Sequence, residues 1–373
     1  MELRIALLPG DGIGPEVLEQ AIKCLRAIEE TFGHHFTTKE GAIGTIAIDK
    51  TGNPLPEETL QICQEADAVL FGAVGHPNFN IDPKAKTRPE QGLLALRKAL
   101  GLYANIRPVQ VFSSLVDNSP LKKEIVSGVD FVIFRELTGG IYFGEKKINE
   151  EETVASDLCE YSEFEISRIA HMAFKAAKNR NNKLTLVDKA NVLVSSRLWR
   201  SVVSKIGESY PEVTLEYLFV DNAAMQLILN PKQFDVILTE NMFGDILSDE
   251  ASVIGGSIGL LASASIGNDN ALFEPIHGSY PKAKGENIAN PIAAILSAAM
   301  MLEHFSLYEE AMAMREAVDK SLKKGIVTPD LYPDTKYGTS HVGDFVADYI
   351  LEYDDDDFKM NDENIGLGKS TII

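Results

Sequence analysis

Short apolar segments alternate with helical segments along nearly the whole chain. The apolar segments have the β-branched content of buried strands, and they are Arg4–Leu8, Ala68–Phe71, Tyr103–Arg107, Phe131–Arg135, Leu184–Val187, Leu215–Val220 and Val236–Leu238. The clearest helical stretches between them are Pro15–Glu30, Gln91–Leu100, Ser162–Asn179 and Ser196–Tyr210. This alternation predicts an α/β architecture with a largely parallel sheet.

Three segments differ from this pattern. Glu136–Asp157 is rich first in glycine and then in lysine and glutamate, which predicts a hairpin or arm that projects towards a partner chain. Pro291–His304 is very apolar and predicts a buried helix. Residues 354–373 begin with a run of aspartates and hold few large apolar side chains, so we expect a mobile tail there.

Length and charge narrow the class of protein. A chain of 373 residues with 45% hydrophobic content is long enough for two globular domains. The short apolar run at the N-terminus breaks at Pro9-Gly10, and we expect neither a signal peptide nor a membrane span. The formal net charge of −20 argues against nucleic acid and anionic membranes as partners. The odd number of cysteines, without metal-like spacing, indicates free thiols in a reducing cytoplasm.

A pair of carboxylates follows the apolar run Val236–Leu238. Asp245 and Asp249 are four residues apart, so in a helix both would project from one face, one turn apart. Like charges this close repel each other, but Mg²⁺ and Mn²⁺ prefer such oxygen ligands and would bind both. A solvated helix face is the alternative. The position after a strand favours a ligand site, because ligands in α/β sheets bind beyond the carboxyl ends of strands.

Charged side chains also end or follow other predicted strands. Arg107 and Arg135 each end an apolar strand, and a guanidinium group can bind a carboxylate through two hydrogen bonds. Lys189 and Asp221 follow two further strands and are candidates for a base and a third metal carboxylate. Separate surface salt bridges are the alternative for the arginines, and for Arg97, which lies in a helical stretch, this alternative is the simpler one.

The chain resembles the isocitrate/isopropylmalate dehydrogenase family of β-decarboxylating hydroxyacid dehydrogenases, and most closely its members that act on 3-isopropylmalate. The resemblance extends to about Tyr349 and is carried by Leu8–Glu16, Asn105–Pro108, Arg135–Gly144, Asp188–Val192, Thr239–Asp249 and Glu274–Ser279. It implies a two-domain fold with a large mixed, mostly parallel sheet that is not a Rossmann fold. The two expected domains are a discontinuous cofactor-binding domain, 1–102 and 258–373, and a domain with the dimer interface and the arm (about 136–157), 103–257.

The resemblance also implies roles for the charged side chains. The substrate carboxylates would be bound by three arginines, Arg97, Arg107 and Arg135. Mg²⁺ or Mn²⁺ would be bound by three aspartates, Asp245 and Asp249 with Asp221 of the partner subunit, so that a homodimer shares its active sites. Lys189, also from the partner subunit, would accept the proton of the substrate hydroxyl. Tyr142 would protonate C3 after CO₂ is lost, since a phenol is protonated at neutral pH.

NAD is the cofactor that the resemblance implies. Its expected contacts are Ile13, Gly75, Glu90, His277, Gly278, Ser279, Lys282, Ala283, Asn290 and Asp330. NAD-dependent members usually read HGSAPDIAGK, whose aspartate binds the ribose hydroxyls, whereas this chain has Lys282 at that position. A lysine there could attract the 2′-phosphate of NADP or simply face solvent, and we keep NAD as the expectation.

Substrate choice would depend on an apolar wall. Relatives that act on isocitrate carry small polar residues where this chain has Leu93 and Leu94, which with Glu90 would accept an isopropyl group and reject a third carboxylate. Val192 of the partner subunit would extend the wall, although both leucines could instead belong to the core. The expected activity is oxidative decarboxylation of 3-isopropylmalate in leucine biosynthesis. The alternatives are a relative that acts on isocitrate, homoisocitrate or tartrate, and a non-catalytic regulatory subunit.

Overall fold

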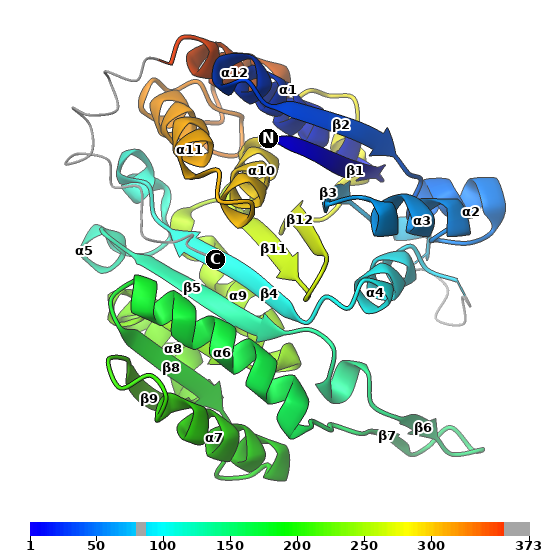
Figure 1. The fold of residues 1–373 in the computed structure, drawn as a ribbon, viewed down its shortest axis with the longest axis vertical. Helices are drawn as coiled ribbons and strands as arrows, with labels where there is room; N and C mark the ends of the chain where they lie inside the picture. The colour runs from blue at the N-terminus through cyan, green and yellow to red at the C-terminus, as the bar shows by residue number, and fades with distance from the viewer. Residues whose placement is uncertain (80–86, 354–373) are drawn as a thin grey trace. The chain divides into compact units, whose positions relative to one another are not determined.

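The computed structural model describes residues 1–79 and 87–353, which divide into two compact units (Figure 1). Unit 1 consists of Met1–Leu102, Phe112–Asn118 and 256–353. Unit 2 consists of Tyr103–Val111 and Ser119–Gly255. The expected tail at 354–373 and part of the expected cofactor region, 80–86, lie outside the described residues.

Unit 1 contains five strands in the order β2-β1-β3-β12-β11. Their bounds are β1 Glu2–Gly10, β2 His35–Glu40, β3 Ala68–Ala73, β11 Ala262–Ile266 and β12 Ala271–Pro275. All neighbours in this order are parallel except β11 and β12, which form an antiparallel pair. The helices of the unit are α1 Gly14–Phe32, α2 Thr45–Thr51, α3 Glu57–Glu65, α4 Glu90–Ala99, α10 Ile292–His304, α11 Tyr308–Lys323 and α12 Thr339–Leu351.

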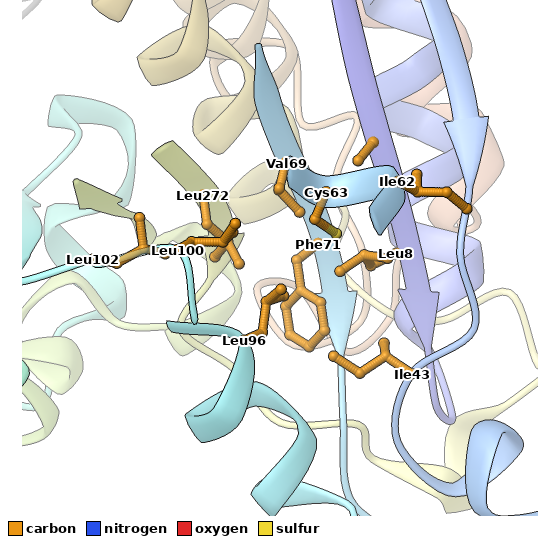
Figure 2. Packing of buried hydrophobic residues seen from close by; sticks show 11 residues of the cluster. Leu8, Ile43, Ile62, Cys63, Val69, Phe71, Leu96, Leu100, Leu102 and Leu272 are labelled. Carbon is orange, nitrogen blue, oxygen red and sulfur yellow. The ribbon is translucent and has the colours of Figure 1, made fainter. Parts of the chain in front are cut away.

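The core of unit 1 is formed by apolar side chains from strands and helices that are distant in the sequence. Figure 2 shows Leu8, Phe71 and Leu272, from three strands, packed in one cluster with Leu96 of α4. Helix α10 is buried on all sides, which confirms the prediction for Pro291–His304. A helix without a polar face can exist only where other elements surround it, and α1 and α11 pack against it.

Five strands of unit 2 pair in the order β4-β5-β10-β8-β9, and two further strands, β6 Lys146–Ile148 and β7 Ala155–Asp157, form a separate ribbon. The bounds of the five are β4 Ala104–Gln110, β5 Asp130–Glu136, β8 Lys183–Asp188, β9 Thr214–Phe219 and β10 Val236–Thr239. Among these five, only β4 runs antiparallel to its neighbour β5. The helices are α5 Lys123–Val126, α6 Glu163–Asn179, α7 Val194–Gly207, α8 Val220–Leu229 and α9 Asn241–Ser252, and the pairs α6 with α7 and α8 with α9 pack together (Figure 1).

The mixed, mostly parallel α/β architecture is therefore confirmed, with corrections at several elements. The predictions missed β2, β11 and β12, which are short, and β2 is almost wholly exposed. The strand predicted at Leu215–Val220 ends at Phe219, because Val220 already begins helix α8. No helix within residues 1–79 and 87–353 has the length and apolar character needed to cross a membrane.

The predicted arm is shorter than expected. Its antiparallel ribbon consists of β6 Lys146–Ile148 and β7 Ala155–Asp157, and all residues of both strands are exposed (Figure 1). The predicted arm began at Glu136, but this residue is the last of β5 and is fully buried. Its carboxylate accepts hydrogen bonds from the backbone N–H groups of Thr138 and Gly139, which holds the glycine-rich loop against the body of unit 2.

Candidate active site

Two arginines of unit 2 lie on the same face of neighbouring strands. Arg135 on β5 is directly opposite Asn105 on β4, and Arg107 is two residues further along β4. Residues two apart on a strand share a face, so all three side chains project together. Arg107 was expected at a strand end, but β4 continues through Pro108 to Gln110. The two arginines meet because β4 is antiparallel to β5, so its N-terminal half lies beside the carboxyl end of β5.

Helix α9 brings two aspartates to these arginines. One Nη atom of Arg107 lies 3.2 Å from Oδ1 of Asp249, and the other lies 3.9 Å from Oδ1 of Asp245. Arg135 donates to Asp245 through Nη1. The prediction that Asp245 and Asp249 occupy one helix face is confirmed, and this face is directed at guanidinium groups. The arginines offset the repulsion between the two carboxylates.

Tyr142 completes this cluster. It ends a short 3₁₀ helix, Gly140–Tyr142, and its hydroxyl donates to Oδ2 of Asp245 over 2.9 Å. The guanidinium carbon of Arg135 lies 5.8 Å from the centre of the Tyr142 ring. Burial raises the pKa of the Tyr142 hydroxyl, and the Asp245 carboxylate raises it further, since both disfavour a phenolate. The hydroxyl is therefore a proton donor at neutral pH.

Lys189 and Asp221 form a second, separate pair. Lys189 directly follows β8, and its Nζ lies 2.8 Å from Oδ1 of Asp221. Asp221 lies in the first turn of α8 rather than at the end of the preceding strand. The hydrogen bond from Lys189 lowers the pKa of the Asp221 carboxyl. Among the described residues, neither side chain bonds to Asp245 or Asp249, and three or more potential metal ligands do not converge anywhere in residues 1–79 and 87–353.

Arg97 belongs to unit 1. It lies in α4, and its Nη2 donates to Oε1 of Glu274 at the end of β12 over 2.6 Å. Both side chains are largely buried. The Nε atom of Arg97 is buried and has no hydrogen-bond partner among the described residues, so one donor of this guanidinium group is left for a further acceptor.

Several of the expected cofactor residues meet in unit 1. The backbone N–H of Ile13 donates to the carbonyl of Ser279, and the Ser279 hydroxyl donates to the carbonyl of Gly75 over 2.6 Å. The backbone N–H of Gly75 donates to Asp11. Gly75 has a φ of +123°, and a Cβ atom there would lie 3.0 Å from Oε1 of Glu90. The three loops and the start of α4 therefore form one connected surface.

The remaining cofactor candidates differ in their environment. The Nδ2 atom of Asn290 donates to Oδ2 of Asp330 over 3.0 Å, so the two side chains are in contact. The Nε2 atom of His277 is buried and lacks a hydrogen-bond partner among the described residues, and burial lowers the pKa of this imidazole. Lys282 is exposed, whereas Ala283 is buried. Apart from Gly278 and its two chain neighbours, no described atom lies within 4 Å of a Cβ built on Gly278, so this backbone faces open space.

The residues of the expected apolar wall also differ. Leu93 packs against the core cluster of unit 1, whereas Leu94 is 43% exposed. Glu90, at the start of α4, is exposed as well, and Val192 in unit 2 is 61% exposed. Leu93 therefore has the core role that was the alternative for both leucines, and Leu94 and Val192 are available for contact with a ligand or a partner.

Sequence analysis missed three residues that contact the arginines. Asn105 accepts from Nε of Arg107 over 2.7 Å, and Ser248 accepts from its Nη1 over 2.6 Å. Asn241 accepts from Nε and Nη2 of Arg135. A signal existed for Asn105, since a polar residue inside an apolar strand requires a partner. Its partner Arg107 lies two residues further along the same strand, on the same face.

Comparisons with known proteins show what the chain is similar to. The family model described as isocitrate/isopropylmalate dehydrogenase matches residues 4–346. The 3-isopropylmalate dehydrogenase of Bacteroides fragilis is 55% identical over 94% of this chain and 99% of its own length. That of Geobacillus kaustophilus is 58% identical over 94% of this chain and 96% of its own length.

Solved structures also resemble the chain. The isocitrate dehydrogenase of Methylococcus capsulatus has a TM-score of 0.84 at 34% identity and covers 94% of this chain and 99% of its own. A β-decarboxylating dehydrogenase from Thermococcus kodakarensis has a TM-score of 0.78 at 37% identity and covers 97% of this chain and 98% of its own. The likeness thus extends over nearly the full length in sequence and in fold.

Proposed function

Because the chain belongs to the isocitrate/isopropylmalate dehydrogenase family, we propose that it oxidises and decarboxylates (2R,3S)-3-isopropylmalate to 4-methyl-2-oxopentanoate and CO₂, with NAD as acceptor, in leucine biosynthesis. Relatives named 3-isopropylmalate dehydrogenase at 55% and 58% identity support this substrate. The observation that carries the proposal is the cluster of Arg107, Arg135, Tyr142, Asp245 and Asp249 in unit 2. This cluster combines cationic, acidic and proton-donating groups at one place.

Arg107 and Arg135 are suited to bind the carboxylates of the substrate. Both guanidinium groups are buried, and their present acidic partners are aspartates on a single helix face. A dicarboxylate that enters would offer the same charge in a bidentate form. Arg97 is proposed as the third such arginine, since its Nε atom has no partner among the described residues.

Asp245 and Asp249 would hold Mg²⁺ or Mn²⁺, with Asp221 of the partner subunit as the third carboxylate. Carboxylate oxygens are the donors that these ions prefer, and one or two of them with a chelating substrate are sufficient. The Asp249 side chain is 67% exposed and so is accessible to a cation. A bound ion would supply Lewis-acid stabilisation of the negative charge that develops on the substrate oxygen.

Lys189 and Tyr142 would move the protons. Lys189 of the partner subunit would accept the proton of the C2 hydroxyl, and NAD would supply the acceptor for the hydride of C2. The bond between C3 and its carboxylate then breaks, CO₂ leaves, and its electron pair forms the enolate of the 2-oxo acid. Tyr142 would donate its proton to C3, since burial and Asp245 keep its hydroxyl protonated.

Unit 2 carries features expected of a homodimer with shared sites. Exposed large apolar side chains occur on α8, α9 and the residues next to them, namely Met225, Leu229, Ile246 and Val253. Such a group of apolar side chains is typical of a protein–protein interface. The Lys189–Asp221 pair has no side-chain bond to Asp245 or Asp249 within the described residues, as expected if it serves the partner's site.

NAD would lie on the connected surface around Ile13, Gly75 and Ser279. The Nε2 atom of His277 has no hydrogen-bond partner in the described part of the chain, and a bound nucleotide could supply one. Lys282 is exposed and can approach a 2′-phosphate, so we expect Lys282→Asp to raise the preference for NAD. We also propose a cytoplasmic location, with which the free thiols of Cys24, Cys63 and Cys159 are compatible.

One set of steady-state assays tests the proposal. 3-Isopropylmalate, isocitrate and tartrate are each assayed with NAD and with NADP in the presence of Mg²⁺. We expect 3-isopropylmalate with NAD to be preferred, by on the order of 10³-fold over isocitrate, because a third carboxylate would be unpaired beside Leu94 and Glu90. Excess chelator should abolish the activity and added Mg²⁺ or Mn²⁺ should restore it. Equal activity on isocitrate would contradict the proposed substrate. Full activity in excess chelator would contradict the proposed metal site.

A further inference from the structure

Asn241, the first residue of α9, connects two parts of the proposed site. This residue is only 1% exposed. Its Oδ1 accepts hydrogen bonds from Nε of Arg135 over 3.1 Å and from Nη2 over 2.8 Å. Its Nδ2 donates to the carbonyl of Gly139 over 3.2 Å. One buried amide thus holds the guanidinium group of Arg135 and the loop that ends in Tyr142.

The chemistry of the partners fixes the orientation of this amide. A guanidinium group has only hydrogen-bond donors, so Arg135 must face the oxygen of Asn241. The Gly139 carbonyl is only an acceptor, so this carbonyl must face the amide nitrogen. With Nε and Nη2 occupied by Asn241, Nη1 of Arg135 is the atom that bonds to Asp245. The amide therefore sets the direction in which Arg135 presents Nη1 to Asp245.

The loop itself is closely packed beside Asn241. A Cβ atom on Gly139 would lie 2.7 Å from the ring of Tyr161, and one on Gly140 would lie 2.2 Å from its hydroxyl oxygen. The same hydroxyl accepts a hydrogen bond from the backbone N–H of Asn241 over 3.0 Å. Asn241 and Tyr161 together leave the loop little freedom, and Tyr142 follows directly from it.

The amide is also neutral, which matters for Arg135. A carboxylate at this position could still accept from the guanidinium group, but it would offset the positive charge that a substrate carboxylate needs. Its second oxygen would face the Gly139 carbonyl without a proton between them. Asn105 accepts in the same way from Nε of Arg107, so both arginines are held by a neutral side chain.

We propose that Asn241 is a positioning residue that orients Arg135 and the Tyr142 loop together while leaving the charge of Arg135 available to the substrate. The inference rests on the proposed function for the identity of the substrate. The geometric part, the joint positioning of the arginine and the loop, depends only on the contacts described above.

The nearly isosteric Asn241→Asp and the truncated Asn241→Ala separate charge from geometry. Asn241→Asp should raise KM for 3-isopropylmalate at least about tenfold, since a charge-assisted hydrogen bond to the substrate is weakened. It should leave KM for NAD within about twofold. Asn241→Ala should lower kcat/KM about 100-fold, because both groups lose their orientation. In both variants, peptides covering residues 139–144 should exchange amide hydrogen faster than in the wild type.

Asn270→Asp is the matched control. The Asn270 amide also donates to a backbone carbonyl, that of Leu100, and within residues 1–79 and 87–353 it makes no hydrogen bond to an arginine. It should lower thermal stability slightly and leave both KM values unchanged. If Asn241→Asp has an unaltered KM for the substrate, or if Asn270→Asp raises that KM equally, the positioning role is wrong. A wild type inactive on 3-isopropylmalate would contradict the proposed function instead, and the exchange of residues 139–144 would still test the geometry.

Discussion

At the residue scale, the aspartates of the site are the counter-ions of its arginines. Asp245 is bonded to Arg135 and Tyr142, and Asp249 is bonded to Arg107. A dicarboxylate and a cation that bind together could take over these partners, the first at the arginines and the second at the aspartates. The net charge among these groups would then change little, which lowers the electrostatic cost of binding an anion to a chain of net charge −20.

Leu93 and Leu94 are adjacent but should have different roles. Leu94 is 43% exposed, so Leu94→Ala should lower kcat/KM for 3-isopropylmalate about tenfold, by loss of apolar contact, and change thermal stability little. Leu93 packs against the core, so Leu93→Ala should lower the free energy of unfolding by about 1–3 kcal/mol. Steady-state kinetics and thermal denaturation of the pair check this. The reverse assignment would show that α4 presents Leu93 to the substrate.

Glu240, next to Asn241, should make stability depend on pH. Burial raises the pKa of its carboxyl, and the nearby Glu136 raises it further. A carboxyl whose folded-state pKa is above its unfolded value binds its proton more tightly when folded. Ionising such a carboxyl lowers the free energy of unfolding. This loss is absent below the unfolded-state pKa and grows as pH rises through the folded-state pKa. Glu240→Gln should therefore gain stability relative to the wild type as pH rises from about 4.5 to neutral.

Denaturation of both proteins across this pH range is the measurement. Glu208→Gln, on the exposed surface, controls for the loss of one carboxylate. If the difference in free energy of unfolding between wild type and Glu240→Gln is constant with pH, ionisation of Glu240 does not destabilise the fold.

At the scale of elements, helix α9 organises unit 2 through one stripe of polar residues. Asn241, Asp245 and Asp249 are spaced four apart, and Ser248 lies beside them. The first holds Arg135, the second contacts both arginines and Tyr142, and the third contacts Arg107. Gly244 allows the close approach, because a Cβ there would lie 2.6 Å from Cγ of Arg135. The helix thus serves as a rigid carrier for the cluster.

The β6–β7 ribbon should contribute to dimer formation. Ile148 and Val154 are 62% and 66% exposed, and an isolated two-stranded ribbon is only marginally stable in water. Replacing residues 147–156 by a short Gly-Ser turn should weaken the dimer, so that activity falls on dilution while the fold of each unit is retained. Lys146 should be kept, since its Nζ donates to the carbonyls of Ile141 and Tyr142.

Analytical ultracentrifugation and activity against protein concentration check the ribbon. Thr153→Ser, within the turn between the two strands, is the control and should leave the association constant unchanged. A deletion variant that dimerises as tightly as the wild type would assign the ribbon another role.

At the scale of the whole molecule, shared sites predict complementation between inactive variants. Lys189→Met should remove the base and Asp245→Asn should weaken the metal site, so each homodimer should be nearly inactive. In a mixed dimer, closed two-fold symmetry gives one site both defects and the other site neither. Co-expression should therefore restore up to about half of the wild-type activity per mixed dimer. Mixed dimers without activity would show that all of these residues act within one chain.

Local pattern was sufficient for the features that one element contains. The buried strands β5, β8 and β10, the all-apolar helix α10 and the helix with Asp245 and Asp249 on one face were predictable, because period and burial are properties of neighbouring residues. The family resemblance of the motifs also needed only the sequence, since it compares residues in order.

Contacts between distant segments were decided by the tertiary structure alone. The sequence does not show that Arg107 lies inside β4, that Asn241 holds Arg135, or that Lys189 pairs with Asp221. It also does not separate Leu93 in the core from Leu94 on the surface. The physical reason is that strand register and helix packing depend on the free energy of the whole fold, and a shift of one residue would direct each of these side chains elsewhere.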